Sequence, residues 1–277
     1  MYLNYFGLTE LPFGITPDTS FIYSGDAHQE ALNTLLIGLS SGEGFIKITG
    51  EVGTGKTLLC RRFLATLSEN YVVAYLPNPQ LEPHILLLAL AEELGLELEA
   101  SNLQFHLVKS INQHLLKMAA QGKSVVVCID EAQCMPIETL ESLRLLSNLE
   151  TEKRKLLQVV MFGQPELDEK LADPSVRQLR QRIVFHYRMP NLRKDEIGHY
   201  LAHRLRIAGH TGGNLFQKAA VRRIYEQSIG TPRLVNVLAH KCLLLAFGEG
   251  KSMVTGAHAV LAGRDTEGAH RTAWWRW

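Results

Sequence analysis

Features of secreted, disulfide-linked or membrane-spanning proteins are scarce in this sequence. Its four cysteines form no CxxC pair and show no Cys/His spacing of a zinc site. The longest fully apolar run, residues 85–91, is far shorter than the roughly 20 residues that a transmembrane helix needs. The first residues have neither the basic region nor the apolar stretch of a signal peptide. We therefore expect reduced thiols and a cytoplasmic location.

Neither sign of charge dominates, because 29 lysines and arginines nearly balance 28 aspartates and glutamates. Such a chain has no strong overall field that would draw it onto nucleic acid or an anionic membrane. One stretch differs, since residues 177–206 hold eight basic residues and two acidic ones. A subunit interface, a nucleic-acid surface and a membrane-facing patch all fit this local excess.

The hydrophobic pattern alternates between short apolar runs and longer helical stretches, which is typical of βαβ units. The short runs predict strands at residues 45–48, 72–76, 125–129, 156–162 and 183–187. The helical stretches before and between them lie at residues 26–39, 58–69, 82–95, 103–121 and 138–149. Since the strands are almost wholly apolar, we expect an α/β fold whose parallel sheet carries helices on both faces.

After residue 190 the strands stop and the pattern becomes helical. The expected helices lie at residues 193–208, 216–228, 232–247 and 256–262. We therefore divide the chain into a core with an N-terminal loop at 1–190, a small all-helical lid at 191–262 and a tail at 263–277. The tail holds three tryptophans, which suit either a disordered end or an anchor at a membrane interface.

A glycine-rich motif between the strand at 45–48 and the next helix predicts a phosphate-binding loop. Its residues match G-x-x-x-x-G-K-[ST] and are Gly50, Glu51, Val52, Gly53, Thr54, Gly55, Lys56 and Thr57. The glycines allow backbone N–H groups to surround a β-phosphate, Lys56 can reach the β- and γ-oxygens, and Thr57 offers Mg²⁺ a hydroxyl. The alternative is a glycine turn with an unused lysine. We expect ATP and Mg²⁺ to bind here.

An acid pair follows the strand at 125–129. Asp130 can hold Mg²⁺ through water, and Glu131 can orient or deprotonate an attacking water. Two acids after a strand can also merely cap the next helix. Together with the phosphate loop, however, this pair favours an enzyme that activates water over a small-molecule kinase.

Three further residues are candidates for sensing the nucleotide. Gln164 follows the strand at 156–162 and can contact the γ-phosphate or the attacking water, or can face solvent in a turn. Arg182, with Arg180 as second choice, can reach a neighbouring subunit's ATP as an arginine finger, or can belong to a charged helix face. Arg233 stands at a helix start, where a cation opposes the helix dipole; an anionic γ-phosphate or a local ion pair would compensate.

The motifs belong to a longer set of matching strings: FGL…PF…PD…FIY, HQEAL, GEVGTGKT, IDEAQ, LESLRLLSNLET, LLQVVMFGQPEL, LRQRI, YLAHRL and GTPRLVN. Up to about residue 262, the chain resembles the ExeA-like (general secretion pathway protein A) branch of AAA+ ATPases. The resemblance implies a P-loop NTPase αβα sandwich with a helical lid. It also implies ATP hydrolysis between the subunits of a homo-oligomer that builds a type II secretion or type IV pilus machine.

The resemblance also implies individual roles. Lys56 and Thr57 would belong to the Walker A motif, Asp130 and Glu131 to Walker B, Gln164 would be the first sensor and Arg233 the second. The finger would lie in the region of Arg180 and Arg182, and residues 6–13 would lie near the adenine. An inner-membrane or envelope assembly protein is the implied partner, with the chain positioned peripherally at the inner membrane.

Longer members of this family continue into a transmembrane helix and a peptidoglycan-binding domain, so wall binding is not carried over to this chain. The alternative function is a DNA-associated ATPase that resembles transposition target selectors, which share the IDEAQ and NLET style of the core. The basic stretch at 177–206 supports that alternative. A nucleotide switch without turnover is a third interpretation and differs only in rate.

Overall fold

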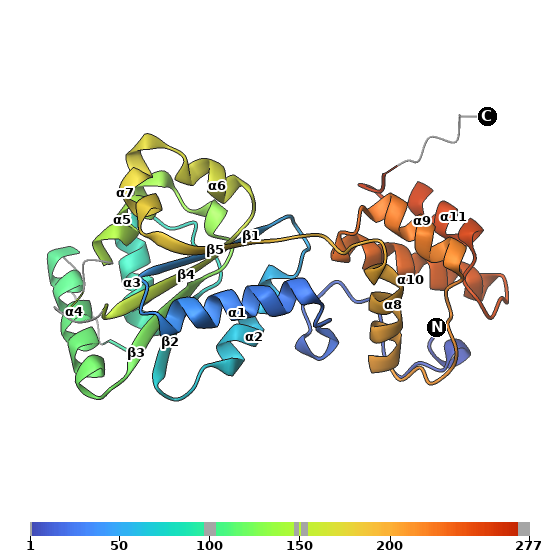
Figure 1. Ribbon diagram of the computed structural model, residues 1–277, viewed down its shortest axis with the longest axis horizontal. Helices are drawn as coiled ribbons and strands as arrows, with labels where there is room; N and C mark the ends of the chain where they lie inside the picture. The colour runs from blue at the N-terminus through green and yellow to red at the C-terminus, as the bar shows by residue number, and fades with distance from the viewer. Residues whose placement is uncertain (1, 97–103, 147–149, 151–154, 271–277) are drawn as a thin grey trace. The chain divides into compact units, whose positions relative to one another are not determined.

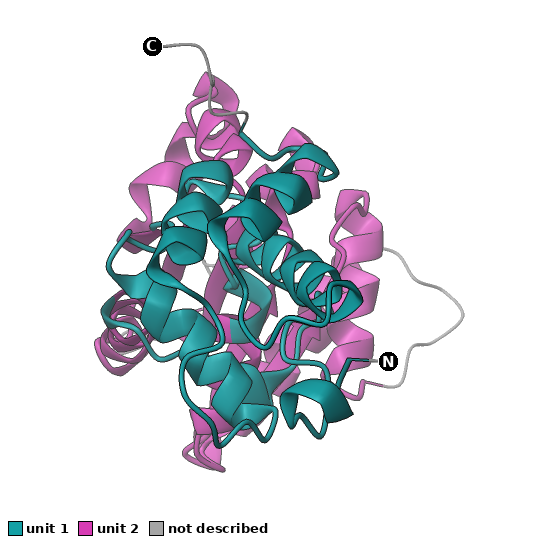
Figure 2. Ribbon diagram, turned by 90° about the vertical axis from the view of Figure 1, so that its right-hand side faces the viewer, with its two compact units in different colours: residues 1–26, 51–58, 190–277 teal, residues 27–50, 59–189 magenta. Residues whose placement is uncertain are grey.

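A computed structural model describes residues 2–96, 104–146, 150 and 155–270 of the chain (Figure 1). It divides into two compact units, which Figure 2 shows in separate colours. We call residues 27–50 and 59–189 the sheet unit, and residues 1–26, 51–58 and 190–277 the helical unit.

The sheet unit contains a five-stranded sheet in the order β2-β3-β4-β1-β5, and every neighbouring pair is parallel. The strands are β1 (Phe45–Gly50), β2 (Tyr71–Leu76), β3 (Ser124–Ile129), β4 (Leu157–Gly163) and β5 (Ile183–Met189). This confirms the predicted parallel α/β fold. The predicted strands deviate only at their ends, where the apolar pattern fades and hydrogen bonding to the neighbouring strand continues.

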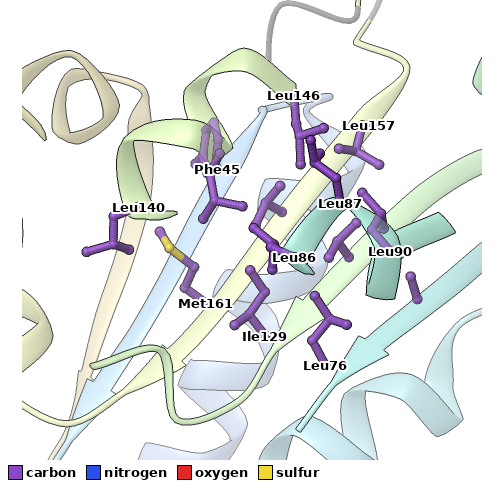
Figure 3. Close-up of a cluster of buried hydrophobic side chains, with 14 of the residues drawn as sticks. Phe45, Leu76, Leu86, Leu87, Leu90, Ile129, Leu140, Leu146, Leu157 and Met161 are labelled. Carbon is purple, nitrogen blue, oxygen red and sulfur yellow. The ribbon is translucent and has the colours of Figure 1, made fainter. Parts of the chain in front are cut away.

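Helices cover both faces of the sheet, which explains why its central strands are largely apolar, whereas residues of the edge strand β5 alternate between half-buried and exposed. Val125, Val127 and Ile129 of β3 lie in one buried cluster, part of which Figure 3 shows. Val126 and Cys128 lie in a second cluster, because successive side chains of a strand point to opposite faces. Burying each large apolar side chain contributes about 1.5–3 kcal/mol. A one-residue slip in the register of a strand would therefore move its buried side chains from each cluster to the other one.

The first cluster is completed by five helices: α3 (Pro83–Glu93), α4 (Gln104–Ala120), α5 (Ile137–Leu146), α6 (Glu166–Leu171) and α7 (Arg177–Gln181). The second is completed by α1 (Asp26–Ser40) and α2 (Lys56–Thr66). The predicted ends at residues 103 and 147–149 lie outside the described residues. The hydrophobic pattern does not predict α6, because six residues are too few to establish a helical period.

The helical unit is built from α8 (Glu196–Ile207), α9 (Lys218–Ser228), α10 (Pro232–Gly248) and α11 (Gly256–Arg264). The N-terminal segment packs with these helices, and its buried apolar side chains are Tyr2, Phe6, Leu8, Phe13 and Phe21. This segment is predicted to belong to the core at residues 1–190, whereas its apolar side chains share one core with α8–α11. Of the predicted tail, residues 271–277 lie outside the described residues.

A buried arginine ties the N-terminal segment to α8. Arg204 is 6% exposed, its Nε donates to the Pro12 carbonyl oxygen at 2.5 Å, and its guanidinium lies 4.7 Å from the centre of the Phe21 ring. Asn236 of α10 donates to the Gly14 carbonyl oxygen at 3.3 Å. These bonds satisfy backbone oxygens that the packed segment would otherwise bury unpaired.

No helix in the described part of the chain is both long and apolar enough to cross a bilayer.

Candidate functional site

The predicted phosphate loop, residues 50–57, follows β1 directly and ends in the first turn of α2. Gly53 and Gly55 have φ angles of 81° and 93°, a left-handed conformation that glycine adopts without strain. Lys56 Nζ donates to the Glu51 carbonyl oxygen at 3.0 Å, and Thr54 Oγ1 donates to the same oxygen at 2.9 Å. The ammonium is thereby held within its own loop, and the residue is only 5% exposed. A buried cation beside a helix N-terminus fits a phosphate group.

Arg233 lies against this loop within the helical unit. Its backbone N–H donates to the Gly53 carbonyl oxygen at 3.3 Å, and it occupies the first turn of α10 directly after Pro232. A Cβ atom added to Gly53 would lie 2.4 Å from the Arg233 Cβ, so only glycine fits there. The structure thus brings a predicted sensor to the predicted loop, although the two are far apart in the sequence.

The acid pair lies at the carboxyl end of β3 in the sheet unit. Asp130 is 3% exposed, its backbone N–H donates to the Leu76 carbonyl oxygen at 2.9 Å, and its Oδ1 accepts from the Glu131 N–H at 3.0 Å. Burial, and then the nearby Asp130 carboxylate, raises the pKa of the Tyr75 hydroxyl to about 12. A buried carboxylate is a hard oxygen ligand of the kind that Mg²⁺ prefers.

Glu131 has a left-handed backbone with φ at 52°, which costs a residue other than glycine about 1–2 kcal/mol. Two side-chain amides converge on its carboxylate. Gln133 Nε2 donates to Glu131 Oε2 at 2.5 Å, and Gln164 Nε2 donates to the same oxygen at 3.0 Å. The two glutamines are also joined, because the Gln164 backbone N–H donates to Gln133 Oε1 at 3.0 Å. The Glu131 side chain is therefore oriented from two sides.

Two members of this arrangement are not among the residues predicted from the sequence. Gln133 lies in the short turn Ala132–Cys134, and Lys170 of α6 donates from Nζ to the carbonyl oxygens of Gln133 and Met135 at 2.6 and 2.7 Å. Lys170 stands at no motif position, and Gln133 closes the matching string IDEAQ, whose implied roles fall on Asp130 and Glu131. Its place in that string, two residues after the acid pair, is the signal that could have drawn attention to Gln133.

The two candidate finger arginines have different surroundings. Arg182 is half-buried, and its Nη1 donates to the Arg144 carbonyl oxygen at 3.2 Å, near the end of α5. Arg180 lies in the last turn of α7 and is exposed. A finger acts on a neighbouring subunit, so the role of either arginine stays a prediction.

Among the described residues, no group of three or more histidine, cysteine, aspartate or glutamate side chains could form a metal site. Mg²⁺ needs no such group, because it commonly binds through one or two protein oxygens, nucleotide phosphates and water. The Thr57 hydroxyl and the Asp130 carboxylate are donors of the right kind. Bound Mg²⁺ would neutralise charge on the phosphate oxygens.

Comparisons with known proteins identify a domain family and several similar proteins. Residues 39–171 match the family model described as an AAA domain. Over 276 residues the chain is 40% identical to general secretion pathway protein A of Aeromonas hydrophila. The aligned region covers 100% of this chain and 50% of that protein. The chain thus spans about half the length of this curated relative.

Solved structures with similar folds include the ORC2 protein of Aeropyrum pernix, with a TM-score of 0.65 and 16% identity over 93% of this chain and 73% of that one. Cdc6p of Pyrobaculum aerophilum has a TM-score of 0.64 and 18% identity, with 90% of this chain and 70% of that one covered. The Holliday junction branch migration motor RuvB of Thermotoga maritima has a TM-score of 0.58 and 16% identity, with 91% of this chain and 73% of that one covered. At such identities these likenesses concern the fold alone.

Proposed function

This chain is an AAA protein of the ExeA-like family, and we propose that it hydrolyses ATP to drive assembly of a type IV pilus or type II secretion machine in the cell envelope. The observation that best supports ATP hydrolysis is the Glu131 carboxylate, which the side-chain amides of Gln133 and Gln164 orient. A carboxylate held in this way can accept a proton from water or orient it.

The phosphate loop and the acid pair act on one nucleotide in this proposal. β1 leads into the loop at Gly50 and β3 leads into Asp130, and both strands belong to one parallel sheet. Ligands of such sheets bind at the carboxyl ends of the strands. Lys56 would neutralise the β- and γ-phosphates, while Thr57 and Asp130 would hold Mg²⁺.

Residues beyond the two motifs complete the site in our proposal. Gln164 would respond to the γ-phosphate as the first sensor, and Arg233 would do so from α10 as the second. Arg182, or Arg180 in its place, would reach the ATP of the next subunit. ATP would then be bound at a subunit interface of a homo-oligomer.

The cellular role follows from the family. The curated relative carries the name general secretion pathway protein A. We propose that, among the ExeA-like proteins, this chain resembles MshM, the pilus-biogenesis ATPase of the mannose-sensitive haemagglutinin system. We infer an inner-membrane or envelope assembly protein as the partner and a peripheral position at the inner membrane. Because fold alone does not give cellular function, this role rests on the resemblance.

Turnover by the purified chain tests the hydrolysis. We expect Mg²⁺-dependent ATP hydrolysis that is abolished by Lys56→Ala and reduced about 10²–10⁴-fold by Glu131→Gln, which removes the base but keeps the side chain's size. Lys251→Ala and Glu138→Gln change exposed residues of the same types and serve as matched controls. A wild-type chain that binds no ATP would refute the proposal, and one that binds without turnover would leave only the nucleotide switch.

The second sensor has its own test. Arg233→Ala keeps the backbone bond to Gly53 but removes the guanidinium, so we expect weaker ATP binding or slower turnover with an unchanged melting temperature. Arg264→Ala at the exposed end of α11 is the control. Equal ATP affinity and equal rates for Arg233→Ala and the wild type would rule out the sensor role.

Identifying what the chain binds distinguishes the envelope role from the DNA-associated alternative. Glu131→Gln with ATP should accumulate an oligomer in sedimentation experiments and should retain envelope assembly proteins in a pull-down. Duplex DNA binding that falls steeply between low and physiological salt would instead favour the alternative.

A further inference from the structure

A groove in the helical unit lies outside the proposed nucleotide site. Its volume is about 1170 Å³, and it is lined by one side of α8, by residues 210–216 and by the first turns of α9. Sites for small molecules typically measure about 300–1,000 Å³, so this groove exceeds the usual metabolite pocket. Its size suits a segment of polypeptide.

The rim of the groove is basic. Lys194, Arg206, Lys218 and Arg222 line it and are exposed, whereas Asp195 is the acidic residue of its lining. Asp195 Oδ1 lies 3.6 Å from Arg193 Nε, so its charge is already offset. Arg222 is paired with Glu226 within α9, while among the ion pairs of the described residues none engages Lys194 or Lys218. The rim therefore favours an anionic ligand.

The floor of the groove is apolar, with the buried Leu201, Leu205 and Phe216 among its lining residues. Two small residues, Gly198 and Ala202, lie one turn apart on α8 and also line the groove. A Cβ atom added to Gly198 would meet only Val221 Cγ1 at 3.9 Å, so the side of α8 is open there. Small residues of this kind let another chain approach a helix closely.

The part of the lining formed by residues 210–216, which we call the wall, is held in place by hydrogen bonds. The ring nitrogens of His210 lie 2.8 Å from the Phe6 carbonyl oxygen and 2.9 Å from the Gly213 carbonyl oxygen. The Val254 backbone N–H donates to the Leu215 carbonyl oxygen at 2.7 Å. Because the wall is fixed in the free chain, a ligand would lose little energy in ordering it.

We propose that this groove binds a short acidic segment of a partner protein, with its carboxylates on the basic rim and apolar side chains on the floor. The lining favours a peptide over nucleic acid. Bases stack on exposed aromatic rings, whereas Phe216 is buried and Tyr23 packs edge-on against Tyr200 and His203. An apolar floor gives a phosphate backbone nothing to contact. This inference concerns docking and does not depend on ATP turnover.

Binding of defined peptides to the full chain tests the proposal. The probes are fluorescent peptides in which glutamates alternate with leucines, versions with glutamine for glutamate, and a labelled DNA duplex. Fluorescence anisotropy should show binding of the glutamate peptides and at least about tenfold weaker binding of the glutamine peptides, because carboxylate–cation bonds are lost. Failure of every glutamate peptide to bind would overturn the proposal.

Variants locate the binding. The double variant Lys194→Glu, Lys218→Glu should weaken peptide binding at least about tenfold, while Lys251→Glu, an exposed lysine outside the groove lining, should leave it unchanged. Ala202→Trp should fill the groove from an exposed position and block the peptide. Unimpaired ATP binding and melting temperature would show that each variant is folded.

Three other results would contradict the proposal. Peptide binding that survives both the charge reversals and Ala202→Trp would place the site elsewhere. Duplex DNA binding that Lys194→Glu, Lys218→Glu abolishes, without peptide binding, would assign the rim to nucleic acid. A wild-type oligomer that Ala202→Trp dissociates in sedimentation would assign the groove to a second copy of the chain.

Discussion

Replacing Gln133 by alanine removes a hydrogen bond from Glu131, while Lys56, Thr57, Asp130 and Glu131 themselves are left unsubstituted. In the wild type, Gln133 Nε2 donates to Glu131 Oε2 at 2.5 Å, and Gln133 Oε1 accepts from the Gln164 N–H at 3.0 Å. A hydrogen bond to a charged group contributes about 1.5–3 kcal/mol. If Gln133 orients the carboxylate for attack by water, kcat should fall about 10- to 100-fold, since about 1.4 kcal/mol corresponds to a tenfold change in rate.

A split between kcat and KM distinguishes this positioning role from a general loss of structure. Gln133 contacts Glu131 and Gln164 but no residue of the phosphate loop in the described contacts, so ATP affinity and KM should stay near the wild-type values. Steady-state hydrolysis and equilibrium binding of a fluorescent ATP analogue measure the two quantities. Gln121→Ala, on an exposed turn after α4, is the matched control.

A double-mutant cycle gives the sharpest check. Once Glu131→Gln has removed the carboxylate, Gln133→Ala should cause little further loss, because the two residues act as one unit. Equal losses on both backgrounds would refute the proposed link, as would a kcat for Gln133→Ala within twofold of the wild type. An increase in kcat would show that the amide restrains Glu131 instead of presenting it.

Two predictions concern stability. Burial, and then the Arg62 charge, lowers the pKa of His28 from its usual 6.5 to about 4, so the unfolded chain binds a proton that the folded chain does not. The free energy of unfolding should therefore fall by up to about 3 kcal/mol as pH drops from 6.5 to 4. Urea unfolding of His28→Gln should lack this pH-dependent loss. A pH profile identical to that of the wild type would contradict the role of His28. Gly230→Ala should cost about 2–5 kcal/mol, because φ is 74° and the new Cβ would lie 2.0 Å from the Leu192 carbonyl oxygen. Gly248→Ala, with open space around it, should be neutral or stabilising, and similar urea midpoints for both variants would count against this reasoning.

Much of the protein follows from the sequence alone, where the determining chemistry is local. The phosphate loop is a contiguous run whose glycines and lysine have their roles within eight neighbouring positions, 50–57. The strands are recognisable because both of their faces are buried, which leaves long apolar runs such as residues 125–129. Asp130 and Glu131 could be predicted as a pair for the same reason, since they directly follow such a run.

The tertiary structure decided what depends on residues far apart in the chain. Gln164 and Lys170 reach the turn of Glu131 and Gln133 only because β4 and α6 pack beside it, and no spacing in the sequence encodes that meeting. The N-terminal segment is a run of turns whose aromatic residues could have packed on any apolar surface, and the fold places them with α8–α11. The basic groove likewise arises from α8, the 210–216 loop and α9 together. Local pattern determines elements and motifs, whereas their shared surfaces are set by packing between distant residues.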